Sequence, residues 1–293
     1  MIAAAAGAPL SPGLLGGWHL HPGPTVLGVG FAIAYLVAAR HASRWPRGRT
    51  VSFLAGVSAL LLVLQSGLDA LGPLLLSAHM VEHVALMLVV PPLLLGGAPL
   101  TLALRTLRGV ARRELGRLLA SRPVRLLGHP TVAVGVFALV VVGAHAPALY
   151  AVKDGVAHAF EHSVLLGAGL ILWSPVVAVD PVPHAPSWPA RVLMLLAAMP
   201  AMSAVGVWLG TAGQPRYPAY IEPARALGVS ALEDQRTAAA VMWVGGSLVL
   251  AAALLVLVPA WMRAEERRTL AREAHADAAR EPAVAGRLPG GVR

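Results

Sequence analysis

Cysteine is absent from the 293-residue chain, and charged residues are scarce. Without cysteine, the chain cannot contain disulfides, thiolate metal sites, iron–sulfur clusters or covalently attached c-type haem. A bound metal would therefore need histidine, methionine, carboxylate or backbone oxygen ligands. Charged residues make up 13% of the chain and hydrophobic residues 57%, whereas soluble domains carry about 25% charged residues. This composition is that of a membrane protein.

The net charge of +9 would suit a nucleic-acid-binding protein, but its distribution does not. The arginines gather in short segments between apolar runs, as they do in the cytoplasmic loops of membrane proteins. We therefore predict that membrane lipid is a partner and that nucleic acid is not. The segment from Met1 to Gly17 lacks a basic region, so no cleavable signal peptide is predicted.

Seven apolar runs are candidates for membrane spans, each near the roughly 20 residues that a helix needs to cross a bilayer. They cover residues 25–39, 51–64, 74–95, 131–144, 157–179, 189–210 and 237–262. The third contains Pro91-Pro92, which should kink the helix and free carbonyl groups that neighbouring helices must satisfy. The pattern predicts an all-α fold, an integral membrane bundle of seven transmembrane helices.

Positive charge alternates along the chain and predicts how the bundle is oriented. Arginine is concentrated between the first and second spans, between the third and fourth, and after the seventh. The positive-inside rule assigns these segments to the cytoplasm, which places the N-terminus outside and the C-terminus inside. The predicted domains are a transmembrane helical bundle over residues 1–262 and a cytoplasmic polar tail over residues 263–293, partly disordered.

The most basic loop follows the third span and carries seven arginines between residues 105 and 125. Leucines interleave with these arginines. Such a pattern is typical of a cationic amphipathic helix that lies on an anionic membrane surface.

Two similar histidine motifs open two of the apolar runs. His79-Met80-Val81-Glu82-His83 opens the third span, and His158-Ala159-Phe160-Glu161-His162 opens the fifth. Residues four apart lie on one face of a helix, with Cβ atoms roughly 6 Å apart, so each histidine pair can bind one metal ion. Imidazole suits zinc, copper, nickel and iron. We predict an outward-facing cluster with four metal ligands, His79, His83, His158 and His162, in which Glu82 and Glu161 orient rings or balance charge.

Four further residues near the same membrane face are candidate ligands. His145 is a candidate fifth imidazole, Met80 and Met242 would supply the thioether that selects Cu(I), and Asp234 would supply a carboxylate. Each of the last three also has a structural interpretation. Methionine in an apolar helix commonly serves packing, and aspartate before a helix commonly caps it.

Three other interpretations of the histidine motifs stay open. Histidine at a helix end can be an interfacial polar residue without a ligand. H-x-x-E-H is also the inverted zinc-protease signature, with two histidine ligands and glutamate as general base, which would indicate a membrane metalloprotease. Haem with two axial imidazoles would need ligands from separate helices, such as His79 and His158.

Further motifs extend from about Tyr35 to Leu257. In chain order they are His79 to His83, Pro91-Pro92-Leu93-Leu94, Gly97-Ala98-Pro99, His145-Ala146-Pro147-Ala148-Leu149-Tyr150, Glu161-His162, Trp173-Ser174-Pro175, Tyr217-Pro218-Ala219-Tyr220, Asp234-Gln235 and Met242-Trp243-Val244. Together they resemble the polytopic CtaG family of cytochrome c oxidase assembly factors. In that family glutamine often precedes the second histidine, where this chain has Glu82.

The resemblance implies a bacterial plasma-membrane protein with seven spans, and we predict that it is not an enzyme. It implies a role in maturing a haem–copper cytochrome c oxidase, by delivering or inserting copper. We predict that the His-rich site holds copper as Cu(I) and passes it to an oxidase subunit. Zinc and haem are the alternative ligands.

Overall fold

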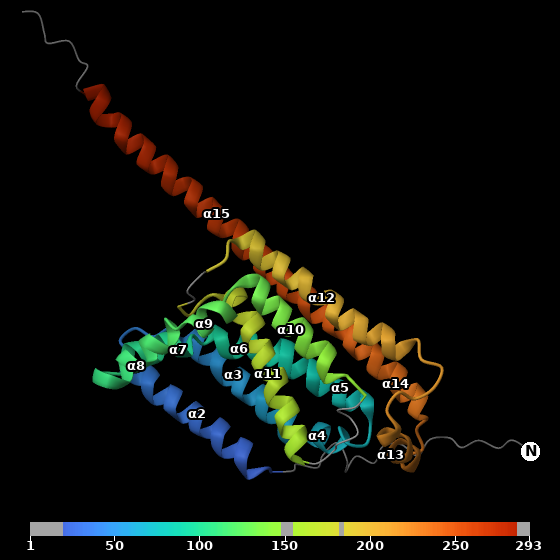
Figure 1. The fold of residues 1–293 in the computed structure, drawn as a ribbon. Helices are drawn as coiled ribbons and strands as arrows, with labels where there is room; N and C mark the ends of the chain where they lie inside the picture. The colour runs from blue at the N-terminus through green and yellow to red at the C-terminus, as the bar shows by residue number, and fades with distance from the viewer. Residues whose placement is uncertain (1–19, 148–154, 182–184, 286–293) are drawn as a thin grey trace, which may run out of the picture. The chain divides into compact units, whose positions relative to one another are not determined.

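The computed structural model describes residues 20–147, 155–181 and 185–285, and in these ranges every regular element is a helix (Figure 1). The predicted all-α fold is thereby confirmed. In chain order the elements are α2 (Pro22–His41), α3 (Arg47–Gln65), α4 (Gly67–Leu71), α5 (Leu76–Val84), η1 (Ala85–Val89), α6 (Val90–Gly96), α7 (Pro99–Thr106), α8 (Gly109–Leu119), α9 (Arg122–Leu127), α10 (Pro130–Ala144), α11 (Gly155–Val177), α12 (Trp188–Gly210), η3 (Pro218–Tyr220), α13 (Ile221–Ala226), α14 (Ala231–Ala240), η4 (Val241–Gly245) and α15 (Gly246–Ala285).

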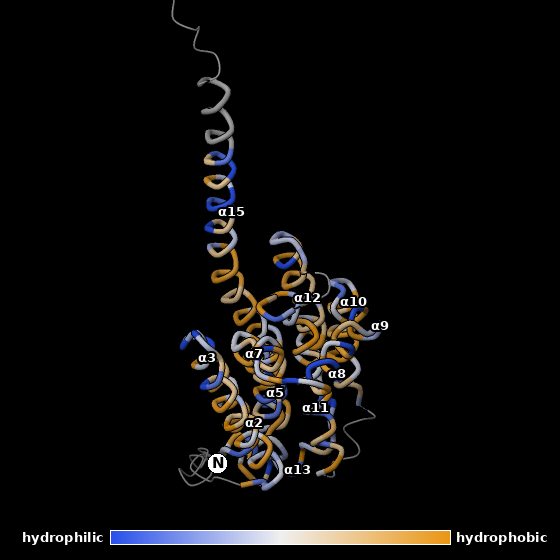
Figure 2. The backbone as a smooth tube through the Cα atoms, turned by 90° about the vertical axis from the view of Figure 1, so that its left-hand side faces the viewer, coloured by the Kyte–Doolittle hydropathy of each residue, from blue (hydrophilic) through white to orange (hydrophobic). Residues whose placement is uncertain are grey.

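Six helical stretches in the described part of the chain are long and apolar enough to cross a membrane, as expected of a multi-pass membrane protein. They are Pro22–His41, Arg47–Leu71, Leu76–Thr106, Gly155–Val177, Trp188–Gly210 and Ala231–His275. Hydrophobic residues, orange in Figure 2, run along them. The predicted fourth span forms α10, which has only 15 residues. The count of seven and the orientation built on it therefore stay predictions.

The chain divides into two compact units, Met1–Leu250 and Ala251–Arg293. The second unit contains most of α15, which continues as a helix to Ala285. Residues 286–293, which belong to the tail predicted as partly disordered, lie outside the described residues. The predicted domain boundary after residue 262 stays a prediction.

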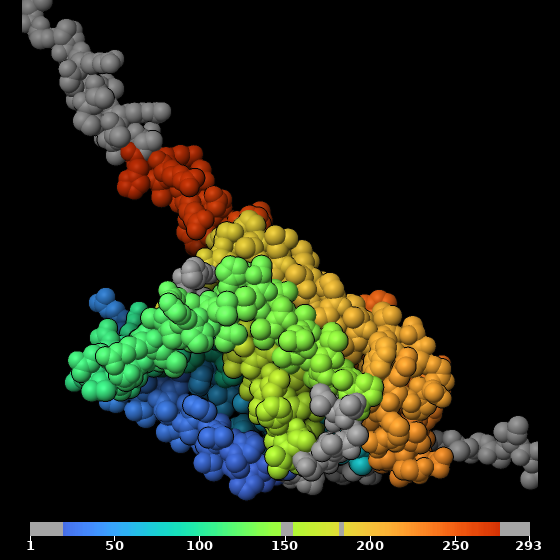
Figure 3. Space-filling model, in the orientation of Figure 1, coloured from blue at the N-terminus to red at the C-terminus, as the bar shows by residue number. Residues whose placement is uncertain are grey.

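Within the first unit, α11 lies among several other helices. It contacts α10, α12, α6 and η1, while α5 contacts α14 and η4. On the face shown in Figure 3, α10 lies beside both α11 and α12. The two histidine motifs lie on α5 and α11, so both belong to this one packed unit.

The third span changes its helical winding where the two prolines occur. α5 passes into the π-helical turn η1, and α6 follows with Pro91 and Pro92 in its first turn. Proline has no N–H to bond the carbonyl four residues earlier, which for Pro91 is that of Met87. The indole Nε1 of Trp173 on α11 donates to this Met87 oxygen at 3.1 Å. The freed carbonyl is therefore satisfied by a neighbouring helix, as the sequence predicted.

The basic segment after the third span folds as three short helices, α7, α8 and α9. Neither α8 nor α9 buries any of its residues. Arginine side chains on these helices are therefore exposed, and their contact with an anionic lipid surface stays a prediction.

Gly169 sets how closely α11 approaches the third span. A Cβ atom at this position would lie 2.6 Å from the backbone oxygen of Met87 and 2.7 Å from Cγ of Pro91. Both distances are below van der Waals contact, and the first involves backbone that cannot rotate away. Only glycine allows α11 to pack here, directly beside the π-helical turn.

Gly169→Ala is expected to destabilise the protein by about 1–3 kcal/mol, because the added methyl group overpacks a closed helix contact. Gly167→Ala is the matched control, since a Cβ there has no neighbour within 4 Å in the described structure. Thermal unfolding of both variants in detergent would measure the difference. Equal midpoints would show that the contact tolerates a larger residue.

Candidate metal centre

The structure brings the two histidine motifs together. His79 and His83 lie one turn apart on α5, and His158 and His162 lie one turn apart at the start of α11. The ring centroids of His79 and His158, on different helices, are 5.4 Å apart. Six residues from the two motifs form one group, which we call the His/Glu cluster: His79, Glu82, His83, His158, Glu161 and His162.

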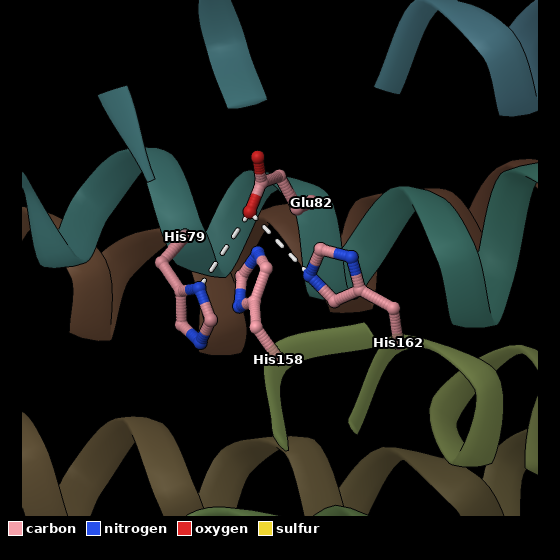
Figure 4. A group of neighbouring side chains, drawn as sticks. All are labelled: His79, Glu82, His158 and His162. Atoms are coloured by element: carbon pink, nitrogen blue, oxygen red, sulfur yellow. Dashed lines mark ion pairs between the residues drawn. The ribbon is translucent and has the colours of Figure 1, made fainter. Parts of the chain in front are cut away.

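Four members of the His/Glu cluster can supply one ligand atom each to a common point. His79, Glu82, His158 and His162 have such atoms within 4.8 Å of one another. His79 Nδ1 and His162 Nε2 each lie 3.6 Å from Glu82 Oε2. Figure 4 shows these four side chains facing one another across the space between α5 and α11.

A second set of three residues shares one member with the first. His79, His83 and Glu161 also have ligand atoms within 4.8 Å of one another. His79 Nε2 lies 3.6 Å from Glu161 Oε2, and His83 Nε2 lies 3.5 Å from Glu161 Oε1. Both carboxylates of the two motifs therefore face imidazoles of the opposite helix.

The separations in the cluster suit metal ligands better than hydrogen bonds. Hydrogen bonds between nitrogen and oxygen span about 2.7–3.2 Å. In a tetrahedral site with metal–ligand distances near 2.0–2.2 Å, neighbouring ligand atoms lie about 3.3–3.6 Å apart. The four nitrogen–oxygen distances of 3.5–3.6 Å fall at or beside this range. The donor set thus fits a cation bound among the side chains.

Burial of the carboxylate on α5 strengthens this interpretation. The side chain of Glu82 is 0% exposed. Within the described residues, neither of its oxygens accepts a hydrogen bond, and Nε2 of His158 and of His162 lacks a hydrogen-bond partner. Burying an ionised carboxylate costs several kcal/mol unless it is compensated. A cation among these atoms would remove that cost.

The α11 side of the cluster is more open than the α5 side. His83 and Glu82 on α5 are fully buried, whereas Glu161 on α11 is 22% exposed and His158 is half-buried. An ion would therefore reach the cluster past α11.

His145, after the end of α10, lies next to His83. Its Nδ1 is 2.6 Å from the backbone oxygen of Val141, so this nitrogen carries the proton and donates. Burial lowers the pKa of His145 to about 4, which keeps the ring neutral and its Nε2 an acceptor. His83 Nδ1, 3.3 Å away, is then the donor to His145 Nε2. The lone pair of His83 is left on Nε2, which faces Glu161.

The remaining predicted candidates have other contacts. Met80 Sδ lies 3.3 Å from His145 Nε2. Met242 is completely buried in the π-helical turn η4. Asp234 on α14 accepts hydrogen bonds from the backbone N–H groups of Leu76, at 2.6 Å, and of Ser77, at 3.3 Å, and from the Ser77 hydroxyl. Asp234 therefore caps the first turn of α5 from another helix.

The structure thus brings six of the ten predicted site residues together in the His/Glu cluster. The other four lie outside the cluster: His145, Met80, Met242 and Asp234. Which of the ten bind metal stays a prediction.

Two tyrosines that the sequence did not single out as site residues also border the site. The hydroxyl of Tyr217 donates to the backbone oxygen of His145 at 2.8 Å. The ring of Tyr220 lies 6.3 Å from that of His79. Burial raises the pKa of both phenols, so both hydroxyls stay protonated. The sequence signal for these tyrosines was their motif, Tyr217-Pro218-Ala219-Tyr220. The local pattern of that motif does not indicate contact with residues so far away along the chain.

Comparison with known proteins links the chain to one family. A family model described as cytochrome c oxidase caa3 assembly factor (Caa3_CtaG) matches residues 29–264. An uncharacterized protein of Mycobacterium tuberculosis is 29% identical over 262 residues, and one of Mycobacterium leprae is 28% identical over 265 residues. Each alignment covers 86% of this chain and 40% of the relative. The chain thus spans well under half the length of these curated relatives. No solved structure matches.

Asp234→Ala is expected to destabilise the protein by about 0.5–2 kcal/mol, because the first turn of α5 loses its cap. Asp234→Asn, which keeps one acceptor oxygen, should lose less. Thermal unfolding in detergent and amide exchange at Leu76 and Ser77 would measure the effect. Unchanged stability together with a lower metal content would instead identify Asp234 as a ligand.

Proposed function

The chain belongs to the cytochrome c oxidase caa3 assembly factor family, and on this premise we propose that it binds copper at the His/Glu cluster and delivers it to a subunit of a haem–copper oxidase. The observation that carries this proposal is the convergence of four imidazoles and two carboxylates at ligand–ligand distances. The protein would work in the bacterial plasma membrane, with the cluster towards its outer face as the charge pattern predicts.

The chemistry of the donors supports copper as cargo. Imidazole is a good ligand for copper. A delivery protein must also release its ion. The partial exposure of Glu161 and His158 provides an exchange route on the α11 side. The buried Glu82 and His83 would contact the ion on the opposite side of the cluster, away from solvent.

A hydrolytic zinc centre is the second candidate, because His79, His83 and Glu161 form a two-histidine, one-glutamate donor set. This set occurs in zinc proteases with a nearby glutamate as general base. Glu82 would have to be that base. It is completely buried and lies between His79 and His162, whereas a general base must reach the water that attacks the substrate.

Haem is disfavoured by the arrangement of the rings. His79 and His158, the pair that would bind iron from opposite sides, are stacked with an interplanar angle of 28°. Two axial ligands would instead point their nitrogens at one iron atom from opposite faces of the macrocycle.

His79→Ala is expected to lower copper affinity about 10–100-fold or more, because His79 belongs to both sets of candidate ligands. An anaerobic Cu(I) competition titration of the full chain in detergent would measure this, together with a Cu(II) titration and a visible spectrum before loading. His129→Ala is the matched control, since His129 is exposed at the start of α10.

Unchanged affinity in a folded His79→Ala protein would contradict the ligand assignment. A Soret band in the unloaded protein would favour haem. Zinc-dependent peptide cleavage that is lost in Glu82→Gln, with zinc still bound, would favour the hydrolase. In cells, deletion of the gene should leave the oxidase low in copper, and the His79→Ala variant should not restore it.

A further inference from the structure

The two nitrogens of His79 face two different carboxylates. Nδ1 lies 3.6 Å from Glu82 Oε2, and Nε2 lies 3.6 Å from Glu161 Oε2. The imidazole ring is rigid, and its two nitrogens direct their lone pairs away from each other. The ring of His79 can therefore belong to both sets of candidate ligands at the same time, with a different nitrogen in each.

The geometry points to a centre that holds two metal ions at once, bridged by the imidazole of His79; this inference rests on the proposed metal-binding role of the cluster. We assign the first position to Nδ1 of His79, because this nitrogen faces Glu82, and His158 and His162 complete the same set of candidate ligands. We assign the second position to Nε2 of His79, because this nitrogen faces Glu161, and His83 completes that set. Figure 4 shows the first position, where His158 and His162 of α11 meet Glu82 of α5.

Burial provides an independent reason to place a cation at each position. Glu82, in the first, is 0% exposed and accepts no hydrogen bond from the described residues. His83, in the second, is 0% exposed, and its Nε2 has no hydrogen-bond partner among them. The contact between His83 Nδ1 and His145 leaves the lone pair of His83 on Nε2, on the side of Glu161. Each position thus contains a buried polar atom directed into it.

The two positions differ in the number of protein ligands. The first has four, which completes a tetrahedral set, and the second has three. Closed four-ligand sites hold a metal firmly, whereas three-ligand sites leave a position open for an incoming group. The second position therefore has room for a ligand from a recipient protein, whereas the ligand set of the first is complete.

Binding of the second ion requires one proton to leave. A neutral imidazole has one lone pair, so bridging two ions needs the imidazolate form, and the ring N–H proton passes to solvent as the second ion binds. No electron is transferred. Glu82, Glu161 and the imidazolate then carry one negative charge each, which offsets most of the charge of two Cu(II) ions in this buried region.

The test loads the full chain in detergent with Cu(II), removes unbound metal by desalting, and counts copper per chain by elemental analysis. Electron paramagnetic resonance of the same samples measures the unpaired spins. We expect two ions per chain and a spin count well below the copper content, because an imidazolate bridge couples the two Cu(II) ions.

Variants at each position should separate the two ions. His162→Ala should lose the first ion, and both His83→Ala and Glu161→Gln should lose the second, each keeping one ion with its full spin. His83 and Glu161 lie on different helices, so misfolding of one helix would not explain the same loss in both. His129→Ala, outside the cluster, should keep two coupled ions, and circular dichroism would verify the folding of every variant.

Two bound ions with a full spin count in the unaltered protein would overturn the bridge. One ion per chain with a full spin count would overturn the two-ion centre and leave the proposed copper-binding function intact. If the chain bound neither Cu(I) nor Cu(II), both the centre and the proposed function would be overturned.

Discussion

The burial of Glu82 is the constraint on which the arrangement of the site depends. Its carboxylate is completely enclosed, and among the described residues it faces imidazoles at 3.6 Å rather than hydrogen-bond donors. Gly72 packs so closely that a Cβ there would lie 2.8 Å from Glu82 Oε2. An anion held so tightly in an apolar bundle needs a counter-charge. The facing histidines, with or without a metal, are the groups placed to supply it.

The third span is held on both sides of the cluster residues that it carries. Asp234 caps the first turn of α5, and Trp173 donates to the carbonyl of Met87 in the π-helical turn beyond it. Trp173 belongs to α11, the same helix that supplies His158 and His162. The contact that satisfies the proline-freed carbonyl therefore also aligns the two ligand-bearing helices. The close approach at Gly169 acts at the same contact.

The proposed delivery role agrees with the unequal burial of the two halves of the cluster. The α5 half of the cluster is buried, and the α11 half is partly exposed. His145 lies outside the cluster but sets the tautomer of His83, because its own Nδ1 proton is donated to the backbone oxygen of Val141. Membership of the caa3 oxidase assembly factor family fits such a role.

The helices and the two histidine pairs could be predicted from local sequence patterns, because such patterns depend on residues close together in the chain. Apolar runs predicted the helices, and the four-residue spacing placed His79 with His83 and His158 with His162. The fourth run, predicted over residues 131–144, forms the 15-residue helix α10. Asp234 was predicted as a ligand or as a cap, but its partner is the helix that begins 158 residues earlier.

The sequence by itself determined the two histidine pairs and their chemistry, since helical periodicity is local. Only the tertiary structure decided that the pairs meet, that His145 orients His83, and that His79 faces Glu82 with one nitrogen and Glu161 with the other, because these contacts depend on how distant helices pack against each other.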